Sequence, residues 1–502
     1  MSLNMKKRMC CLLLLLGLAM GLWQAAALYK GENYMYSDTG KSVYAPAAYA
    51  IADVLDGSKI GCGLFSSPQD LFVSPDNRLY IADKGNNRVV VLNPDYSLDT
   101  VIETYVDETG EVAFSGPTGV FVSGDGILYV CESEKGRVLM LDGSGRLIRT
   151  LGRPDTDLLD KDIIFRPVKV VADNIGTIYV ACTGIYQGMV TYDMSGAFTG
   201  FYGASKIELT GAVLANLFWK SLFSQEQAKA MTRIIPTEYS NVFMDNKNFI
   251  YATSLSTENS LDELKKLNAL GENILYYPQN SGFYPKNNYG DIEKRVVKSQ
   301  TTDSRIVDVQ VDPDGFISLL DAENGRVFQY DQESDLLAVF GNNGERKGTF
   351  KQAVSLEKWE GRYWILDAEK GTLTAMQTTR YGDMLRTAVG FYARGEYRAS
   401  TELWENILKS NSNLSIAYKS IGKALCQQGQ YEEALPYFKK SNDRGGYSEA
   451  LRIVRKEFVR KNLVWLLAAA VVAGCGIKWL IGLIRKRAGF EAGKAKQKKE
   501  TM

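Results

Sequence analysis

Residues 72–95 read FVSPDNRLYIADKGNNRVVVLNPD. Apolar and polar residues alternate on both sides of the central IADKGNNR, which is the pattern of two antiparallel strands joined by a tight turn. Taken alone, the Asp, Asn and Arg of this turn are candidates for a ligand or metal site. That interpretation depends on whether the pattern occurs once or recurs along the chain.

The pattern recurs five more times. Positions equivalent to Tyr80 are spaced 46 to 72 residues apart, and the copies lie at 128–145, 178–196, 250–271, 317–334 and 363–376. An apolar strand precedes each copy, and a further strand that runs towards Gly follows several of them. Four antiparallel strands per unit, repeated six times, predict a mainly β protein with a six-bladed β-propeller over residues 28–377.

The pattern resembles the NHL repeat, whose consensus runs P-x-G-V-x-V and then Y-V-A-D-x-x-N-x-R-V. The first unit matches this consensus at Pro68, Tyr80, Ala82, Asp83, Asn86 or Asn87, and Arg88. The second and fifth units keep the arginine, as Arg137 and Arg326, and the others lack it. The resemblance implies the propeller fold, but NHL-type propellers serve as enzymes, sensors and binding platforms.

Two further segments complete or interrupt the ring. The segment 44–61 precedes the first inner strand and has the pattern of an outer strand, so we expect it to complete the sixth blade and close the propeller. A helical insertion is predicted at about 204–235 between the third and fourth blades. It is either a lid, docking or membrane-facing element, or a helix packed on a neighbouring loop.

Acidic residues recur directly after the second strand of four units: Asp83, Glu132, Asp321 and Asp367. One interpretation is a ring of carboxylates near one mouth of the propeller, able to hold a cation or bind a sugar. The other is that each acid pairs with the arginine of its own blade, as Asp83–Arg88, Glu132–Arg137 and Asp321–Arg326. Since units without the arginine mostly lack the acid too, we favour the structural pairing.

The segments that break the repeat contain the candidate ligand- or partner-binding residues. Their aromatic side chains lie beside polar residues, a combination that binds sugars and partner proteins. The candidates are Trp219, Phe223, Tyr276, Tyr277, Phe283, Tyr284 and Tyr289.

Composition excludes several kinds of function. The chain contains no histidine, which removes the common general base and every imidazole-ligated metal site. The chain has 59 basic and 58 acidic residues, so its formal net charge of +1 does not indicate a nucleic-acid-binding protein. We expect no required cofactor and no catalytic residues, while oxygen-ligated divalent cations such as calcium remain open.

After residue 377 the apolar period becomes helical. Gly395/Gly429, Tyr397/Tyr431 and Trp404/Phe438 pair at a spacing of 34 residues, so residues 378–460 resemble tetratricopeptide repeats. This small helical solenoid is either a stalk that orients the propeller or a groove for the peptide of a partner.

Two apolar segments predict a membrane topology. Residues 1–27 have the pattern of a signal peptide, either cleaved or kept as an anchor. Residues 461–484 are long and apolar enough for one transmembrane helix, and the basic residues of 485–502 favour a cytoplasmic tail. The propeller and helical repeats would then lie outside the cell membrane.

These features favour a membrane-anchored binding or scaffold protein that presents the propeller to a protein partner or a carbohydrate, as an accessory to a membrane transport or envelope complex. The alternative resembles the gluconolactonase family of six-bladed propellers, whose divalent metal is held by Glu, Asn and Asp. That resemblance would give Glu132, Asp321 and Asp367 the role of metal ligands. A sensor is a third hypothesis, but a tail of about 18 residues is too short for a signalling domain.

Overall fold

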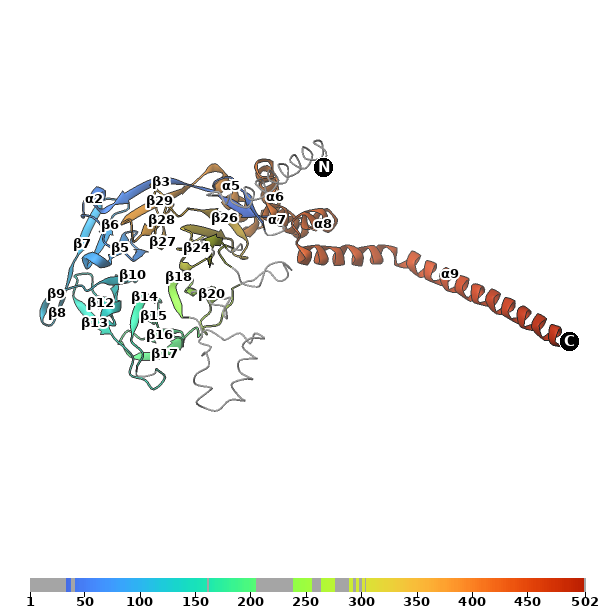
Figure 1. Cartoon of the computed structure of the whole chain (residues 1–502), viewed down its shortest axis with the longest axis horizontal. Coiled ribbons are helices and arrows are strands. Elements are labelled where there is room, and N and C mark those ends of the chain that lie inside the picture. The colour runs from blue at the N-terminus through green and yellow to red at the C-terminus, as the bar shows by residue number, and fades with distance from the viewer. Residues whose placement is uncertain are drawn as a thin grey trace, which may run out of the picture.

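Six β-sheets surround a common axis, as Figure 1 shows. Five of the sheets have four strands and one has three described strands. The protein is therefore a six-bladed β-propeller followed by a helical region, as predicted. This computed structural model describes residues 33–37, 41–159, 162–204, 238–254, 263–275, 289–291, 295–297, 300–302 and 304–500.

The blades follow one another along the chain, and the first strand of each contacts the first strands of its neighbours around the ring. Blade one consists of β4 (Asp70–Val73), β5 (Leu79–Asp83), β6 (Arg88–Leu92) and β7 (Leu98–Ile102). Blade two consists of β10 (Pro117–Val122), β11 (Leu128–Glu132), β12 (Arg137–Leu141) and β13 (Leu147–Leu151). Blade three consists of β14 (Arg166–Ala172), β15 (Ile178–Thr183), β16 (Met189–Tyr192) and β17 (Phe198–Tyr202). Blade four consists of the described strands β18 (Tyr239–Met244), β19 (Ile250–Ser254) and β20 (Leu264–Leu267). Blade five consists of β23 (Ile306–Val311), β24 (Ile317–Asp321), β25 (Arg326–Tyr330) and β26 (Leu336–Phe340). Blade six consists of β27 (Ala353–Trp359), β28 (Arg362–Asp367), β29 (Thr372–Thr378) and β3 (Tyr49–Asp56).

Alternation along each strand explains why the blades stack. All five residues of β5 are buried, because each face of the sheet is covered by a neighbouring blade. Ile81 packs in a cluster with Trp364 of the sixth blade, whereas Tyr80 packs in a cluster with Val130 of the second blade. Successive side chains of one strand therefore join two different neighbours.

The recurring turn needs a left-handed residue directly before the third strand. Asn87 has a φ of 53° in the first blade, and Gly136 has a φ of 62° in the second. Glycine and asparagine adopt this conformation at low steric cost, so the Gly and Asn residues at this position of the repeat have a structural role.

The ring is closed by strand β3. It pairs antiparallel with β29, from Thr372 opposite Asp56 to Thr378 opposite Tyr49. The predicted closing role of segment 44–61 is confirmed, and the outer edge of blade six receives its fourth strand from the N-terminal part of the chain.

Short hairpins and short helices lie outside the six blade sheets. They are the hairpins β1 (Tyr34–Tyr36) with β2 (Ser42–Tyr44), β8 (Thr104–Asp107) with β9 (Gly110–Ala113), and β21 (Arg295–Val297) with β22 (Gln300–Thr302), and the short helices α2 (Gly57–Ile60), η1 (Lys84–Asn86) and η2 (Ser133–Lys135).

Five helices follow the propeller. The first four pack on one another in chain order, and they are α5 (Arg380–Ala393), α6 (Tyr397–Ser410), α7 (Ser415–Gln427) and α8 (Tyr431–Lys440). The last, α9 (Arg444–Glu500), projects away from the ring in Figure 1. By length and composition it can cross a membrane, and its most apolar section has no buried residues.

The propeller and the first helices share one hydrophobic core. Leu385 of α5 and Trp404 of α6 belong to the same buried cluster as Phe316 and Tyr363 of blades five and six. Thr379 caps the N-terminus of α5 and donates its backbone N–H to Ala48 O at 2.9 Å, beside the closing strand. The helices are thus packed against the site where the ring closes.

Gly382 shows how close this packing is. A Cβ atom at Gly382 would lie 2.1 Å from Ala48 O, whereas a Cβ at Gly390 of the same helix would meet only the flexible Arg394 side chain at 3.2 Å. We predict that Gly382→Ala lowers the free energy of unfolding by about 1–3 kcal/mol through this clash. The matched Gly390→Ala change should raise it by up to about 1 kcal/mol, because alanine favours helix. Thermal and denaturant unfolding of the two variants measures the difference, and equal effects would contradict the described junction.

Candidate functional site

The inner strands place one residue of each blade at the same level of the central channel, as shown by the equivalent register with the second strands. We call this level the polar layer, and it consists of Asp70, Gly119, Lys169, Asn241, Asp308 and Ser355. Side chains two positions later face the same way. They form the mixed layer, which consists of Phe72, Phe121, Val171, Phe243, Gln310 and Glu357.

Polar contacts join different blades across the polar layer. Lys169 Nζ lies 2.5 Å from Asp70 Oδ1. Ser355 Oγ lies 2.8 Å from Asp308 Oδ2 and 3.3 Å from Asp70 Oδ1. Asn241 Nδ2 donates to Asp308 Oδ1 at 2.7 Å. Side chains of five blades therefore form one continuous buried network, and the backbone amide of Val120 in blade two joins it by donating to Asp70 Oδ2 at 2.9 Å.

Gly119 stands between the two partners of the ion pair in the polar layer. Lys169 in blade three reaches Asp70 in blade one, and the position between them in the polar layer has no side chain. A Cβ at Gly119 would lie 2.4 Å from Val168 O, so the backbones also approach closely here.

The channel holds more acidic groups than basic ones. Asp70, Asp308 and Glu357 face the single ammonium of Lys169, and all four residues are at most 6% exposed. Burial raises the pKa of Asp308 to about 6 and the pKa of Glu357 to about 8, although Lys169 acts in the opposite direction. Burial also raises the pKa of Asp70 despite its lysine partner. Near neutral pH, Glu357 is therefore mainly protonated.

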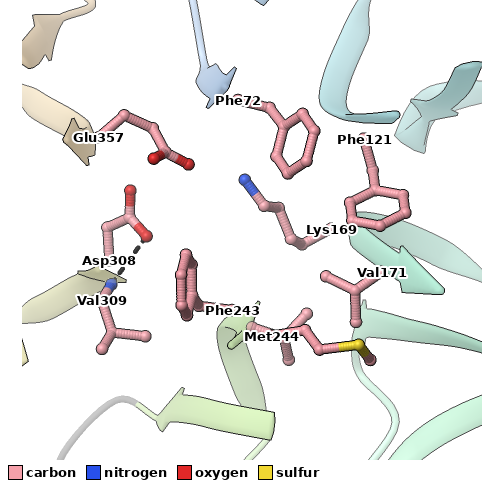
Figure 2. A pocket seen from close by; sticks show the side chains of 10 residues that line it. Phe72, Phe121, Lys169, Val171, Phe243, Met244, Asp308, Val309 and Glu357 are labelled. Carbon is pink, nitrogen blue, oxygen red and sulfur yellow. Dashed lines mark hydrogen bonds between the residues drawn. The ribbon is translucent and has the colours of Figure 1, made fainter. Parts of the chain in front are cut away.

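A cavity opens beside these two layers, and Figure 2 shows side chains from several blades pointing into it. Its lining residues are Phe72, Phe121, Lys169, Val171, Val242, Phe243, Met244, Asp308, Val309 and Glu357. A carboxyl group with a pKa near 8 can gain or lose a proton near neutral pH. The described part of the chain contains no group of three or more His, Cys, Asp or Glu residues arranged to hold a metal ion. The cavity has a volume of about 20 Å³, so it places a titrating carboxyl group beside a space for about one water molecule.

The recurring acids occupy the turns of the blades. Asp83 accepts a hydrogen bond from Arg88 Nε at 2.7 Å and one from a backbone amide of the preceding loop at 2.8 Å. Glu132 does the same with Arg137 Nε at 2.6 Å and a loop amide at 2.6 Å. Both of these carboxylates are fully buried, and each joins its turn to the loop that enters the blade.

The third predicted pair, Asp321–Arg326, is wrong. Asn324 Nδ2 donates to Asp321 at 2.8 Å, as Asn86 donates to Asp83 in blade one, but no arginine joins this contact. Arg326 instead pairs with Asp291 at 3.3 Å and lies over the ring of Tyr34, 4.9 Å from its centroid. A more distant acid and an aromatic ring have replaced the local partner.

Asp367 needs no arginine. Its carboxylate accepts backbone N–H groups from Lys351 at 2.7 Å, Glu369 at 3.0 Å and Lys370 at 2.9 Å. These contacts explain why the sixth blade keeps the acid although threonine stands at the arginine position.

Tyr289 differs from its predicted role. It is 5% exposed, its ring packs 5.2 Å from the ring of Tyr330, and its hydroxyl lies 3.1 Å from Ser334 Oγ. The residue belongs to a buried core cluster, so its ring does not offer an open face to a ligand. The other aromatic candidates lie outside the described residues: Trp219, Phe223, Tyr276, Tyr277, Phe283 and Tyr284.

The sequence interpretation missed Asp70, Lys169, Asp308 and Glu357. A signal was present, because the glycine of the consensus P-x-G-V is kept only as Gly119. Charged residues replace it in three other blades. Comparing this one column among the repeats would have predicted Asp70, Lys169 and Asp308 inside the channel, whereas Glu357 stands two positions after the column.

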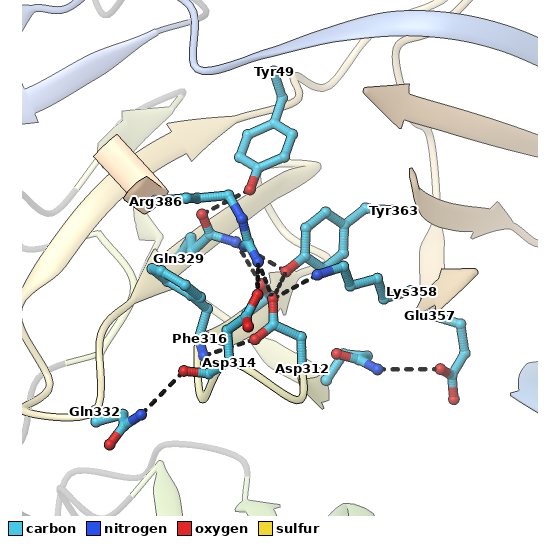
Figure 3. Close-up of polar contacts among 12 residues, drawn as sticks. Tyr49, Asp312, Asp314, Phe316, Gln329, Gln332, Glu357, Lys358, Tyr363 and Arg386 are labelled. Atoms are coloured by element: carbon cyan, nitrogen blue, oxygen red, sulfur yellow. Dashed lines mark hydrogen bonds and ion pairs between the residues drawn. The ribbon is translucent and has the colours of Figure 1, made fainter. Parts of the chain in front are cut away.

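A second polar cluster joins the channel strands to the helices, as Figure 3 shows. Asp312 follows β23 and receives Lys358 Nζ at 2.7 Å and Arg386 Nη2 of α5 at 2.6 Å. Burial alone would raise the pKa of Asp312, but the two cations hold it below its usual range. In contrast with Glu357, this buried carboxylate is fully compensated.

We predict that Lys169→Met destabilises the propeller, because Asp70 would remain buried without its cation. Breaking a buried ion pair by removing one partner typically lowers the free energy of unfolding by about 3–5 kcal/mol. The control Lys135→Met changes an exposed lysine in η2 and should stay within about 0.5 kcal/mol of the wild type. Urea unfolding at pH 7, followed by tryptophan fluorescence, compares them; a similar loss in both variants would argue against the channel pair.

We predict that Glu357→Gln alters the pH dependence of stability. Because the pKa of Glu357 is raised by burial from 4.5 to about 8, the folded protein binds more protons than the unfolded chain between these values. The free energy of unfolding of the wild type should therefore fall through this window as the pH rises, and the variant should lack this contribution. The difference between the two proteins, measured by urea unfolding from pH 4.5 to 9, should grow in favour of the variant up to about pH 8. Parallel curves would show that Glu357 titrates normally.

Comparisons with known proteins agree with the fold. The NHL repeat family model matches residues 65–92, which cover most of the first blade. A search of curated proteins finds no match to the chain.

Three solved structures illustrate the structural similarity. Virginiamycin B lyase from Staphylococcus aureus aligns with a TM-score of 0.39 at 10% identity, covering 66% of this chain and 100% of that one. A gluconolactonase from Xanthomonas campestris aligns with a TM-score of 0.39 at 12% identity, covering 67% and 98%. A protein of unknown function from Bacteroides thetaiotaomicron also gives 0.39 at 12% identity, covering 69% and 76%. Structural similarity at this level of identity assigns no function. The chain is a six-bladed β-propeller protein whose first blade matches the NHL repeat.

Proposed function

We propose that this protein is a membrane-anchored, extracytoplasmic binding platform. It would present the propeller to a protein partner or a carbohydrate, as an accessory to a membrane transport or envelope complex. The observation that carries the proposal is the close packing of the propeller on helices that lead directly into a helix of membrane-spanning length.

Half-buried ion pairs hold α7 against blade five. Lys419 Nζ lies 2.5 Å and 2.7 Å from the two carboxylate oxygens of Asp335, and Lys423 contacts both Asp335 and Glu333. Burial alone would raise the pKa of Asp335, but the two ammonium groups hold it below its usual range. Charge-assisted contacts of this kind have defined directions, so they restrict the angle between the propeller and the helix.

The same contacts favour a stalk over a peptide groove. Arg386 of α5 reaches Asp312 of the propeller, and Lys419 and Lys423 of α7 reach the turn between β25 and β26. These faces of the two helices are therefore occupied by the propeller itself. The resemblance to tetratricopeptide repeats remains a prediction, but the role that we propose for the helices is to position the propeller.

The apolar part of α9 supports the anchor. Large apolar side chains such as Trp465, Val472 and Trp479 are 68–78% exposed, and surface of this kind is stable in lipid rather than in water. Together with the predicted signal peptide at 1–27 and the basic residues of 485–502, this places the propeller outside the membrane in our proposal.

The gluconolactonase-like alternative gains no support from its expected metal ligands. The carboxylates of Glu132, Asp321 and Asp367 are occupied by backbone amides or by side chains of their own turns. We therefore propose binding rather than hydrolysis.

The proposal is tested with the full chain in intact cells. A tag after residue 502 should resist protease added outside the cells, whereas the propeller should be degraded. In cells not treated with protease, the full chain should sediment with the membranes after alkaline washing. Photo-crosslinking from Ile175, which is 88% exposed on blade three, should then capture a defined neighbour in the membrane. Recovery of the chain in the soluble fraction, or a propeller protected from external protease, would refute the proposed topology; failure to crosslink to any neighbour would count against the platform.

A further inference from the structure

We propose that the part of α9 directly before its apolar section binds the phosphates of anionic lipids on the propeller side of the membrane. Four basic residues form this site, which we call the basic collar: Arg455, Lys456, Arg460 and Lys461. The inference rests on the proposed membrane anchor and goes beyond it, because an apolar helix can cross a bilayer without selecting a class of lipid.

The collar residues are exposed, and the protein leaves most of their charge uncompensated. Lys461 has a 4.0 Å contact with Glu457, between side chains that are 77% and 57% exposed. An exposed pair of this kind contributes little. The other three collar residues make no ion pair with any part of the chain that the structure describes. Residues 455–461 thus contain four positive charges and one negative charge, and their net charge is +3.

The position of the collar along α9 fits the headgroup layer of a bilayer. The apolar section runs from Leu463 to Ile484, and at 1.5 Å per residue it spans about 33 Å, enough for a hydrocarbon core of about 30 Å. The collar then lies about 3–12 Å outside the hydrocarbon. The headgroup layer is about 5–8 Å thick on each side, and long basic side chains can reach its phosphates from this distance.

The collar surrounds the helix instead of following one face. At about 100° per residue, its four side chains are spread over about 240° of the helix circumference. A lipid headgroup layer surrounds a membrane-spanning helix on all sides, whereas an acidic protein partner would approach from one side. The distribution of charge therefore favours lipid as the occupant.

Exposed apolar side chains stand among and beside the basic ones. Phe458 is 59% exposed and falls in the sector that the collar leaves open, and Val459 is 47% exposed. A helix that combines Lys and Arg with exposed Phe is typical of a membrane interface. Trp465 is 78% exposed about one turn into the apolar section, and tryptophan is enriched at the same boundary. These side chains place the interface at the depth that the collar requires.

Orientation in the membrane does not explain the collar. Arg485 and Lys486 follow the apolar section, and positive charge at that end favours a cytoplasmic tail. Positive charge before the section opposes the same orientation, so the collar needs another role. Attraction to an anionic membrane surface supplies one, since each basic residue close to that surface adds to binding.

The experiment uses the full chain in phosphatidylcholine vesicles that contain about one-fifth phosphatidylglycerol. A trace of either lipid carries a photoreactive group in its headgroup, and mass spectrometry maps the labelled residues after illumination. We expect the phosphatidylglycerol probe to label residues 452–465 at least threefold more than the phosphatidylcholine probe does. The ratio should fall towards one in 1 M salt, where the Debye length is about 3 Å.

Two variants with the same change of charge separate the collar from general electrostatics. Arg455→Gln, Lys456→Gln, Arg460→Gln and Lys461→Gln together should bring the labelling ratio at 452–465 close to one, while the chain still resists alkaline extraction. The matched control combines Arg394→Gln, Arg398→Gln, Lys409→Gln and Lys439→Gln, which change two exposed arginines and two exposed lysines of the helical region. It should keep the ratio of the wild type.

The outcomes distinguish the collar from the anchor. Equal labelling by the two probes in an alkali-resistant chain would overturn the collar and leave the anchor standing. A preference that survives in the collar variant, or that is lost equally in the control, would also overturn the collar. Extraction of the wild-type chain by alkali would overturn both proposals.

Discussion

The pairing of β3 with β29 is the contact on which the rest of the structure depends. It holds blade six against blade one, so each blade is covered on both sides and strands such as β5 can be apolar throughout. A closed ring also forces six inner strands to face one axis. The channel, its buried charges and the docking site of α5 all follow from this closure.

Burial of charge has two different outcomes in this protein. Where the propeller meets the helices, Asp312 and Asp335 each receive two cations, and the pKa of each is held below its usual range although burial acts the other way. Inside the channel one ammonium serves three carboxyl groups, and burial raises the pKa of Glu357 instead. The first arrangement connects parts of the molecule, whereas the second keeps a carboxyl group that is mainly protonated near neutral pH.

The blade pattern could be predicted because it is local. Two-residue alternation, Gly and Asn in the turns and the pairing of Asp83 with Arg88 all depend on neighbours within one repeat. The partner of Arg326 could not be predicted, because Asp291 belongs to a distant irregular segment. Prediction of the channel residues required a comparison of the six blades with one another. Alternation separates the two faces of a strand but does not reveal which residues of six blades meet at one level.

The closing strand has a consequence for how the protein is made. In a chain synthesised from its N-terminus, β3 emerges before blade one, yet its partner β29 emerges only after the other blades. Until then the sheet edge of β3 is unpaired and available to other strands, and the long sequence separation makes its pairing slow. The helix of membrane-spanning length is only four short helices further along. Completion of the ring and arrival of the anchor are therefore neighbouring events in the history of each new molecule.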